Sequence, residues 1–306
     1  MLPITRSRKI LLSLSTVFVL STALAKELTP DAPKHCEYCE GWNQPFEPVH
    51  VYGNIWHVGT AGLGSVLITS KQGHILIDGG LPQTAPLIAD NIRKAGFRLE
   101  DVKLLVNSHT HYDHAGGLAA LQRASGAKVA ASPEAKLALE NGGPLKNDPQ
   151  FTFGPEHNNY PAVSKVRAIA DGETLRVGKL AITAHFTPGH TPGGTSWTWK
   201  SCEGERCLNF VYADSLNSVS APDFRFSADA TRVASFEQSI ARVEQLPCDV
   251  ILAAHPNAID LERKQQEAKS GAGSKAFVDS TACKTYAAGA RQRLEARLAE
   301  ERAAGN

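Results

Sequence analysis

The sequence lacks an excess of charge of either sign. Its 32 Lys and Arg residues nearly balance its 31 Asp and Glu residues, which gives a formal net charge of +1. A protein that binds nucleic acid or an anionic membrane surface normally carries a basic excess. The composition therefore gives no reason to invoke either partner, and we expect neither.

Beyond its N-terminal region the chain also lacks internal repeats and any hydrophobic run long enough to span a bilayer. At the N-terminus, basic residues precede an apolar stretch at 10–20, and Ala23-Leu24-Ala25 forms a small-x-small cleavage pattern. The apolar stretch is too short for a comfortable membrane span. We therefore interpret 1–25 as a signal peptide and expect an exported, periplasmic protein whose single domain is 26–306. An uncleaved membrane anchor is the alternative.

The run His109-Thr-His-Tyr-Asp-His114 concentrates side chains that bind metals, three imidazoles and one carboxylate within six positions. In extended backbone His109 and His111 point to the same side, whereas the adjacent Asp113 and His114 diverge, so that neighbours can serve two metals. Imidazole and carboxylate without thiolate suit zinc, with iron or manganese as alternatives. The run therefore predicts a metal site rather than a loop whose histidines only satisfy hydrogen bonds.

Two further histidines follow predicted strands and complete a larger set of ligands. His190 lies in the turn-rich segment Thr187-Pro-Gly-His-Thr-Pro-Gly-Gly194, and His255 lies in Ala253-Ala-His-Pro256. Together with the first run they make five imidazoles and one carboxylate. That set offers three protein ligands to each of two metals and leaves positions open for water and substrate.

The hydrophobic pattern predicts short buried strands that alternate with amphipathic helices. A strand at 102–106 leads directly into His109 and a helix at 118–123 follows, so the histidine run occupies a strand-to-helix loop. The other expected segments are an irregular leader at 26–47, strand content at 49–58, 65–69, 74–78 and 129–131, helices at 85–95 and 133–140, a long loop at 141–164, strands between 166 and 212, a helix at 235–245, a strand at 250–253 and a helix from about 281 to 302. Two β-rich sections, each followed by helices, predict a layered α/β domain with two sheets inside and helices outside.

The chain holds six cysteines, and an even number in an exported protein favours disulfides. Local spacing favours Cys202–Cys207. A Cys248–Cys283 bridge would tie a late strand to the C-terminal helix, and Cys36–Cys39 would pair by elimination. A redox or zinc role for Cys36-x-x-Cys39 is the alternative, although this segment lacks the strand-to-helix context of a redox motif.

These motifs together resemble the metallo-β-lactamase superfamily over nearly the whole chain after residue 25. The resemblance rests on His-x-His-x-Asp-His, the preceding strand that ends at Asp78, the Thr-Pro-Gly-His turn and the late histidine. It is most similar to subclass B3, in the following segments: Asp148-Pro-Gln-Phe151, Thr191 to Trp199, Tyr212-Ala-Asp-Ser-Leu216, and Cys248 to His255 with Cys283. The resemblance implies the four-layer αβ/βα sandwich of this family.

The resemblance also implies roles for individual residues. The first of two zinc ions would be held by His109, His111 and His190, and the second by Asp113, His114 and His255. Asp113 would also be catalytic, by orienting a metal-bound hydroxide. Residues implied at the substrate are Ser215, Asn217 and Gln150.

Three positions are less well defined by the resemblance. Asn217 stands where similar enzymes keep Ser or Thr. Asp214 matches a metal-bridging acid in hydrolases that resemble glyoxalase II, but a B3 likeness makes it a supporting residue. Asp78 is either a support for the metal loop or a turn residue at a strand end.

The implied activity is zinc-dependent opening of the β-lactam amide bond in penicillins, cephalosporins and carbapenems, which gives antibiotic resistance. Zinc would supply hydroxide near neutral pH and stabilise the oxyanion. A monomer that takes a small-molecule substrate is expected. The alternatives are a hydrolase of thioesters, lactones or phosphodiesters on the same fold, an exported zinc-binding protein without turnover, and a thiol redox protein.

Overall fold

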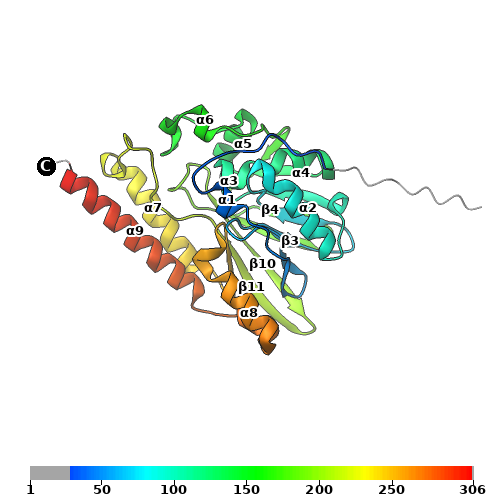
Figure 1. The fold of residues 1–306 in the computed structure, drawn as a ribbon. Helices are drawn as coiled ribbons and strands as arrows, with labels where there is room; N and C mark the ends of the chain where they lie inside the picture. Colours follow the sequence, from blue (N-terminus) through cyan, green and yellow to red (C-terminus); the bar gives the residue numbers. More distant parts are fainter. Residues whose placement is uncertain (1–27, 305–306) are drawn as a thin grey trace, which may run out of the picture.

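The structure, a computed structural model, describes residues 28–304. Two β-sheets lie between outer helices, and Figure 1 shows the helices that follow the first sheet's strands on one side and the later helices on the other. The predicted four-layer αβ/βα sandwich is confirmed. The predicted signal peptide, 1–25, lies outside the described residues.

The first sheet has seven strands in sequence order from β1 to β7. Its strands are β1 (Val49–Tyr52), β2 (Ile55–His57), β3 (Val66–Ile68), β4 (His74–Ile77), β5 (Val102–Val106), β6 (Lys128–Ala131) and β7 (Val166–Ala168). The pairs from β1 to β4 are antiparallel, and those from β4 to β7 are parallel. Parallel neighbours bring the carboxyl ends of β4 and β5 to the same edge of the sheet.

The second sheet has five strands in the order β12-β11-β10-β9-β8. These strands are β8 (Thr174–Val177), β9 (Leu180–Phe186), β10 (Thr195–Glu203), β11 (Arg206–Ala213) and β12 (Val250–Ala253). Only the pair of β11 and β12 is parallel. Because of that pairing, the residues after β11 and after β12 leave the sheet side by side.

Helices connect the strands and cover the outer faces. The α-helices are α1 (Cys39–Trp42), α2 (Ala85–Lys94), α3 (Tyr112–Ala115), α4 (Leu118–Ser125), α5 (Pro133–Asn141), α6 (Pro155–Asn158), α7 (Ala230–Gln245), α8 (Leu261–Glu267) and α9 (Ala282–Ala304). Tighter turns are the 3-10 segments Pro82–Thr84, Leu99–Asp101, Phe151–Phe153, Phe226–Ala228, Pro256–Ile259 and Gly273–Phe277, and a π-turn at Ala268–Ala272. Local sequence sets the helix ends: the side chain of Ser132 caps α5, and Gly142 ends it with a positive φ of 75°.

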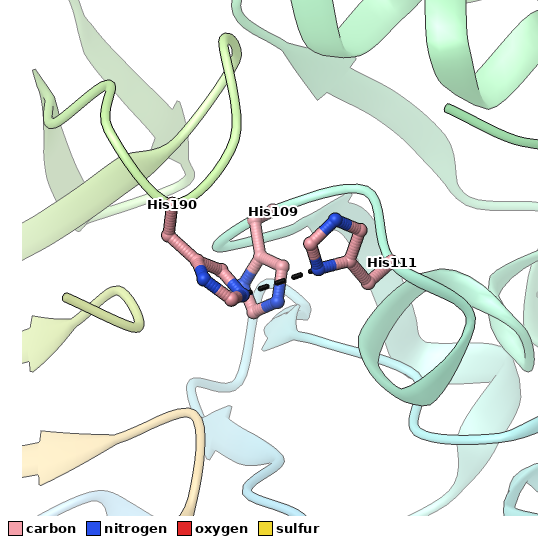
Figure 2. Close-up of side chains that lie close together, drawn as sticks. All are labelled: His109, His111 and His190. Carbon is pink, nitrogen blue, oxygen red and sulfur yellow. Dashed lines mark hydrogen bonds between the residues drawn. The ribbon is translucent and has the colours of Figure 1, made fainter. Parts of the chain in front are cut away.

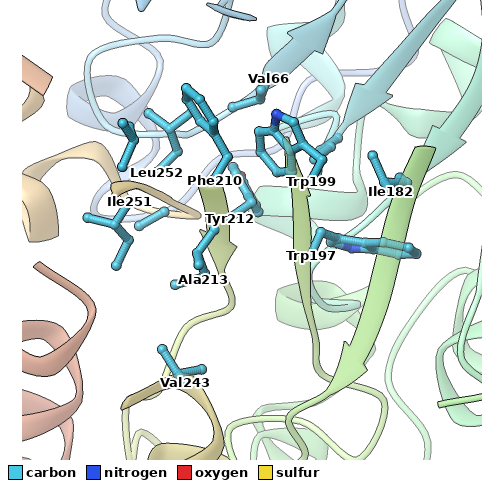
Figure 3. Packing of buried hydrophobic residues seen from close by; sticks show 14 of the residues in the cluster. Val66, Ile182, Trp197, Trp199, Phe210, Tyr212, Ala213, Val243, Ile251 and Leu252 are labelled. Atoms are coloured by element: carbon cyan, nitrogen blue, oxygen red, sulfur yellow. The ribbon is translucent and has the colours of Figure 1, made fainter. Parts of the chain in front are cut away.

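The main core lies between the two sheets and continues between the second sheet and the helices α7 and α9. Figure 3 shows Trp197 and Trp199 of β10 among aliphatic and aromatic side chains of both sheets. Trp197 is fully buried, and its indole N–H donates to the carbonyl of Asn107 over 2.9 Å. This bond ties the second sheet to the chain segment that precedes His109. A second cluster packs the first sheet against α2, α4 and α5.

Two segments differ from the sequence prediction in physically simple ways. The strand content at 49–58 is a hairpin, because Gly53, with φ of 55°, turns the chain between β1 and β2. The segment 26–47, which was expected to be irregular, contains the short helix α1 after Cys36. Among the described residues, no helix combines enough length and apolar character to cross a membrane.

The cysteine pairings that local spacing and elimination favoured are confirmed. Disulfides join Cys36 to Cys39, Cys202 to Cys207 and Cys248 to Cys283. The last one ties the segment just before β12 to α9. Both cysteines of the Cys36-x-x-Cys39 pair are used in this bridge, so neither thiolate is available to zinc.

Candidate metal centre

The predicted ligands come together at the edge where several strands end. Asp78 follows β4, and His109 comes shortly after β5. His190 lies in the turn between β9 and β10, while His255 follows β12. Strand ends from both sheets thus deliver these side chains to one rim of the sandwich.

His109, His111 and His190 form one compact group of buried imidazoles. Each offers a ring nitrogen, and these atoms lie within 4.8 Å of one another. Figure 2 shows the three rings pointing toward one another, with His111 and His190 joined by the dashed line. The structure thus brings these three expected ligands together.

Partners outside the cluster decide which nitrogen of each ring points inward. His111 places Nε2 3.1 Å from Oδ1 of Asp148, and His190 donates through Nδ1 to the carbonyl of Asn217 over 2.8 Å. A neutral imidazole has one N–H, so with these outer bonds both inner nitrogens carry lone pairs. The inner atoms, His111 Nδ1 and His190 Nε2, are nevertheless only 3.1 Å apart.

A cation between the rings resolves this contact, and a divalent metal fits it. His109 strengthens the fit, because its Nε2 is buried without a hydrogen-bond partner among the described residues. Three inward nitrogens without a thiolate match the ligand preference of zinc.

Asp113, His114 and His255 form the second group. Oδ2 of Asp113 lies 3.0 Å from Nε2 of His114 and 3.5 Å from Nε2 of His255, and the two imidazole nitrogens are 3.2 Å apart. Nδ1 of His255 donates to the carbonyl of Gly62 over 3.0 Å, which turns Nε2 inward. A further ligand-like group combines His109 with Asp113 and His114, so the two sets adjoin.

The expectation of extended backbone through the whole run 109–114 is wrong for its second half. Tyr112–Ala115 form the short helix α3. Helical backbone sets adjacent side chains about 100° apart, instead of on opposite sides as in a strand, and Asp113 and His114 can then meet over 3.0 Å. The pair therefore belongs to one ligand group together with His255.

Asp78 supports the loop that carries the histidine run through its carboxylate, and its backbone turns the chain after β4. Its carboxylate accepts from the backbone N–H of Ser108 over 2.6 Å and from the hydroxyl of Tyr212 over 2.7 Å. Its Oδ2 lies 3.6 Å from Nδ1 of His114. With φ of 62°, Asp78 holds a left-handed conformation that is unusual without glycine. Both roles that the sequence left open for Asp78 are present.

Asp214 is fully buried behind His109. Its Oδ1 lies 2.9 Å from Nδ1 of His109 and accepts from the backbone N–H of Ser215 over 2.8 Å. It therefore contacts the nitrogen opposite to the unpartnered Nε2. Burial and the nearby Asp78 carboxylate raise the pKa of Asp214 well above its ordinary value. This position suits support of a ligand rather than a bridge between metals.

Burial and mutual repulsion set the charge of the imidazoles. Burial, followed by the surrounding histidines, lowers the pKa of His109, and burial with His111 lowers that of His190 to about 3. Burial also lowers the pKa of His114, but Asp113 and Asp78 outweigh it and raise the pKa to about 10. Likewise burial raises the pKa of Asp113, but the histidines outweigh it and hold the pKa below its usual range. His109 and His190 are thus neutral near pH 7, as metal ligation requires, whereas a metal at the second group would have to displace the proton that Asp113 and Asp78 hold on His114.

The residues expected at the substrate lie next to these groups. Gln150 is buried, and its backbone N–H donates to Oδ1 of Asp148 over 2.8 Å. Ser215 is buried beside Asp214, while Asn217 is half-buried and uses its carbonyl to hold His190.

Comparisons with known proteins agree with this arrangement. A family model described as the metallo-β-lactamase superfamily matches residues 65–202. The solved structure of the Rm3 metallo-β-lactamase is 52% identical, covers 88% of this chain and 99% of its own, and superimposes with a TM-score of 0.84. MEM-A1, a subclass B3 metallo-β-lactamase from a soil metagenome library, is 50% identical over 86% of this chain and 99% of its own, with a TM-score of 0.82. The chain belongs to the metallo-β-lactamase superfamily, in subclass B3.

A further B3-like structure and more distant relatives give the range of the family. MIM-1 from Novosphingobium pentaromativorans is 41% identical, covers 87% of this chain and 94% of its own, and has a TM-score of 0.81. The hydroxyacylglutathione hydrolase of Anaeromyxobacter dehalogenans (strain 2CP-C) is 28% identical over 170 residues, 55% of this chain and 52% of that protein. The chain thus spans about half the length of this curated relative.

Sequence reasoning missed the outer partners of this metallo-β-lactamase site. Asp148 was noted only as part of a motif, and the carbonyls of Gly62 and Asn217 had no signal in the sequence. These groups lie far along the chain from the histidines that they hold, by 37 residues for Asp148 and 193 for Gly62. Only the fold brings them together.

Proposed function

We propose that this protein hydrolyses the amide bond of β-lactams, including penicillins, cephalosporins and carbapenems, with two zinc ions, and so gives antibiotic resistance. The observation that carries the proposal is the pair of adjacent ligand groups, whose ring nitrogens are turned inward by outer partners. The sequence identity of 52% with the Rm3 metallo-β-lactamase, in an alignment that covers 99% of that chain, supports the substrate class.

In this proposal His109, His111 and His190 hold one zinc ion, and Asp113, His114 and His255 hold the other. When bound, zinc lowers the pKa of water and polarises a carbonyl oxygen. The residues themselves contribute a rigid and largely buried ligand set. In nearly every histidine the ring nitrogen that points away from the metal position contacts a fixed partner, which holds the ring in place. The ligands therefore need little rearrangement during the reaction.

Asp113 is proposed as the catalytic residue of the chain. Its carboxylate remains ionised, since the histidines hold its pKa low. An ionised carboxylate accepts a hydrogen bond from the attacking water and orients it toward the amide carbon. Ser215, Asn217 and Gln150 are proposed to bind and position the substrate.

The remaining proposals concern the whole protein. We propose that 1–25 is a cleaved signal peptide, that 26–306 form the metallo-β-lactamase domain, and that the enzyme acts as a monomer in the periplasm. The disulfides support an oxidising compartment.

Thioester hydrolysis is the second candidate, because curated relatives are hydroxyacylglutathione hydrolases. The position of Asp214 argues against it. A metal-bridging carboxylate would have to face the inward nitrogens, whereas Asp214 contacts Nδ1 of His109 on the outer side.

Hydrolysis by the zinc-loaded, oxidised protein tests the proposal. We expect opening of benzylpenicillin, a cephalosporin and a carbapenem, followed by loss of activity with a chelator and recovery with zinc. His190→Ala should lower kcat/KM by about 100-fold or more, because loss of an outer partner alone typically lowers metal affinity or activity 10–100-fold. His50→Ala, on an exposed residue of β1, is the matched control and should retain the rate.

Two outcomes would contradict the proposal at different points. Absence of ring opening by a zinc-replete sample would reject β-lactam hydrolysis, and a parallel assay with a glutathione thioester would then test the second candidate. Full activity of His190→Ala would reject the assignment of the first zinc site but not the activity.

A further inference from the structure

The C-terminal half of α9 holds the loop that follows the proposed substrate residues Ser215 and Asn217. This loop, 218–227, leads toward α7, and Figure 1 shows α9 alongside α7. None of the proposed metal ligands belongs to the loop. Two charged side chains of α9, Arg297 and Glu301, lie one helical turn apart and contact the loop at several points.

Glu301 is a buried carboxylate surrounded by donors. Only 6% of its surface is exposed. Its Oε1 accepts from Nε of Arg297 over 2.6 Å and from the backbone N–H of Phe226 over 3.1 Å, and its Oε2 accepts from the backbone N–H of Ser227 over 2.7 Å. Hydrogen bonds to an ionised group are stronger than those between neutral groups. The carboxylate therefore fixes the end of the loop on α9.

Arg297 extends the contact to the first part of the loop. Its Nη2 donates to the hydroxyl of Ser220 over 2.8 Å and to the carbonyl of Phe224 over 3.3 Å. Desolvation offsets much of the attraction within a buried ion pair. We therefore expect the pair of Arg297 and Glu301 to affect the position of the loop more than the net stability of the protein.

The same loop contacts the segment that carries Gln150. The N–H of Ala221 donates to the carbonyl of Pro149 over 2.9 Å, and the hydroxyl of Thr152 donates to Oδ1 of Asp223. In the sequence these two contacts lie on either side of Gln150, a proposed substrate residue. A shift of the loop would therefore move Gln150.

The metal centre has supports of its own on α9. The hydroxyl of Tyr286 donates to the carbonyl of Asp214 over 2.7 Å, and the hydroxyl of Ser218 donates to the carbonyl of Arg293 over 3.2 Å. These contacts lie on either side of Asn217, whose carbonyl holds a proposed zinc ligand. Loss of the ion pair further along α9 leaves both contacts in place.

We propose that Arg297 and Glu301 are positioning residues for the substrate, because they hold loop 218–227 against the segment around Gln150 and so determine how tightly substrate binds beside the metal centre. Both residues act through the loop and not by contact with the substrate. The inference rests on the proposed function, which supplies the β-lactam that Gln150 would contact.

Steady-state hydrolysis of benzylpenicillin by the zinc-loaded protein tests the pair. We expect Arg297→Met and Glu301→Gln to raise KM about five- to tenfold, which is the effect of one lost hydrogen bond to the substrate. Loss of binding that is equal in the ground state and the transition state leaves kcat unchanged, and zinc affinity should remain that of the parent. Arg297→Lys should fall between these variants and the parent, because an ammonium still pairs with Glu301. Arg263→Met is the matched control, since Arg263 contacts Glu267 over the same 2.6 Å and with the same spacing on the exposed surface of α8.

The outcomes separate positioning from general support of the fold. Unchanged KM in Arg297→Met and Glu301→Gln, or an equal rise in Arg263→Met, overturns the proposal. A fall in kcat together with zinc affinity also overturns it, since the pair would then support the metal centre as a whole. If Arg297→Met fails to fold, Glu301→Gln decides, because it keeps the shape of the side chain and because the Arg297 side chain, 28% exposed, reaches water.

Failure of the proposed function has a different signature. A parent protein that opens no β-lactam rejects that function, and the comparison of KM values then uses the glutathione thioester of the second candidate. A parent that hydrolyses neither substrate overturns the inference as well, since there would be no substrate to position.

Discussion

Outer contacts to single atoms give this metal centre its geometry. Asp148, the carbonyl of Asn217 and the carbonyl of Gly62 each hold one ring nitrogen, and each thereby directs the other nitrogen inward. Such partners set the tautomer and orientation of a ligand and raise its basicity. Asp148 is the one of these partners that acts through its side chain, so its substitution should change metal affinity before it changes the fold.

Asp148 offers the most direct test among these residues. We expect Asp148→Ala to lower zinc affinity about 10–100-fold, because His111 loses the partner of its Nε2. Asp148→Asn should fall between this variant and the parent, since an amide oxygen can still accept from His111. Competition with a chromophoric chelator measures the affinity. Asp223→Asn, on an exposed residue, is the control, and unchanged affinity in Asp148→Ala would refute the role.

His57, away from the metal centre, should make stability depend on pH. It is buried without a hydrogen-bond partner among the described residues, and burial lowers its pKa from 6.5 to about 3. In the unfolded state His57 is protonated below about pH 6.5, whereas in the folded state it stays neutral down to about pH 3. The free energy of unfolding therefore falls as the pH drops from 6.5 to about 3.

The effect of His57 is measurable by urea unfolding at pH 7 and pH 5. Between these values we expect the parent to lose about 2 kcal/mol more than His57→Leu. His50→Leu should behave like the parent, because His50 is exposed. Equal losses in the parent and His57→Leu would show that His57 does not contribute.

Among the elements, the short segment that contains α1 has an influence beyond its size. The carbonyl of Trp42 accepts from the hydroxyl of Thr60 over 2.6 Å and from the N–H of Gly62 over 3.2 Å. The Trp42 ring lies 5.5 Å from the ring of His255, centroid to centroid. A Cβ on Gly62 would lie 2.6 Å from Cα of Trp42, so only glycine allows this approach. Trp42 thus holds the backbone that orients His255.

Removal of the disulfide next to α1 should therefore weaken metal binding. We expect Cys36→Ala/Cys39→Ala to lose zinc more readily in chelator competition, because His255, a proposed zinc ligand, loses support. Cys202→Ala/Cys207→Ala removes another short bridge at the far end of the β10–β11 hairpin and should keep the parent's zinc affinity. Equal zinc retention in both double variants would contradict the proposed link.

For the whole molecule, α9 completes the second helical layer and is joined covalently to the segment that leads into β12. The Cys248–Cys283 bridge closes a loop of 35 residues, and Glu301 near the other end of α9 accepts from the N–H groups of Phe226 and Ser227. The helix is thereby attached at both ends. Constraint of so long a loop lowers the entropy of the unfolded chain.

Global stability should depend on this bridge more than on the hairpin bridge. Chain-entropy estimates give about 4 kcal/mol for the long loop and about 2 kcal/mol for the loop closed by Cys202 and Cys207. We expect Cys248→Ala/Cys283→Ala to lower the free energy of unfolding by about 2 kcal/mol more than Cys202→Ala/Cys207→Ala. Urea unfolding measures both, and a larger loss at the hairpin would contradict the estimate.

Much of the metal centre follows from local sequence, because its ligands lie in recognisable contexts. The run 109–114 carries four of the six proposed ligands, and His190 and His255 each follow a strand whose apolar residues mark it. Strand and helix patterns also predicted both sheets in outline. The sequence did not predict the short helix α3. A helix of four residues has too few positions to show a hydrophobic period.

The sequence by itself determined which side chains can bind metal, which strands deliver them, and the layered α/β class, since composition and hydrophobic spacing are local properties. Tertiary structure alone decided which ring nitrogen of each histidine points inward. That choice depends on contacts with Asp148, Asn217 and Gly62. Asn217 and Gly62 make their contacts through backbone carbonyls, which every residue has and which therefore leave no mark in the sequence. It also placed Asp214 behind His109. These are relations between distant segments, and they exist only once the sheets have packed together.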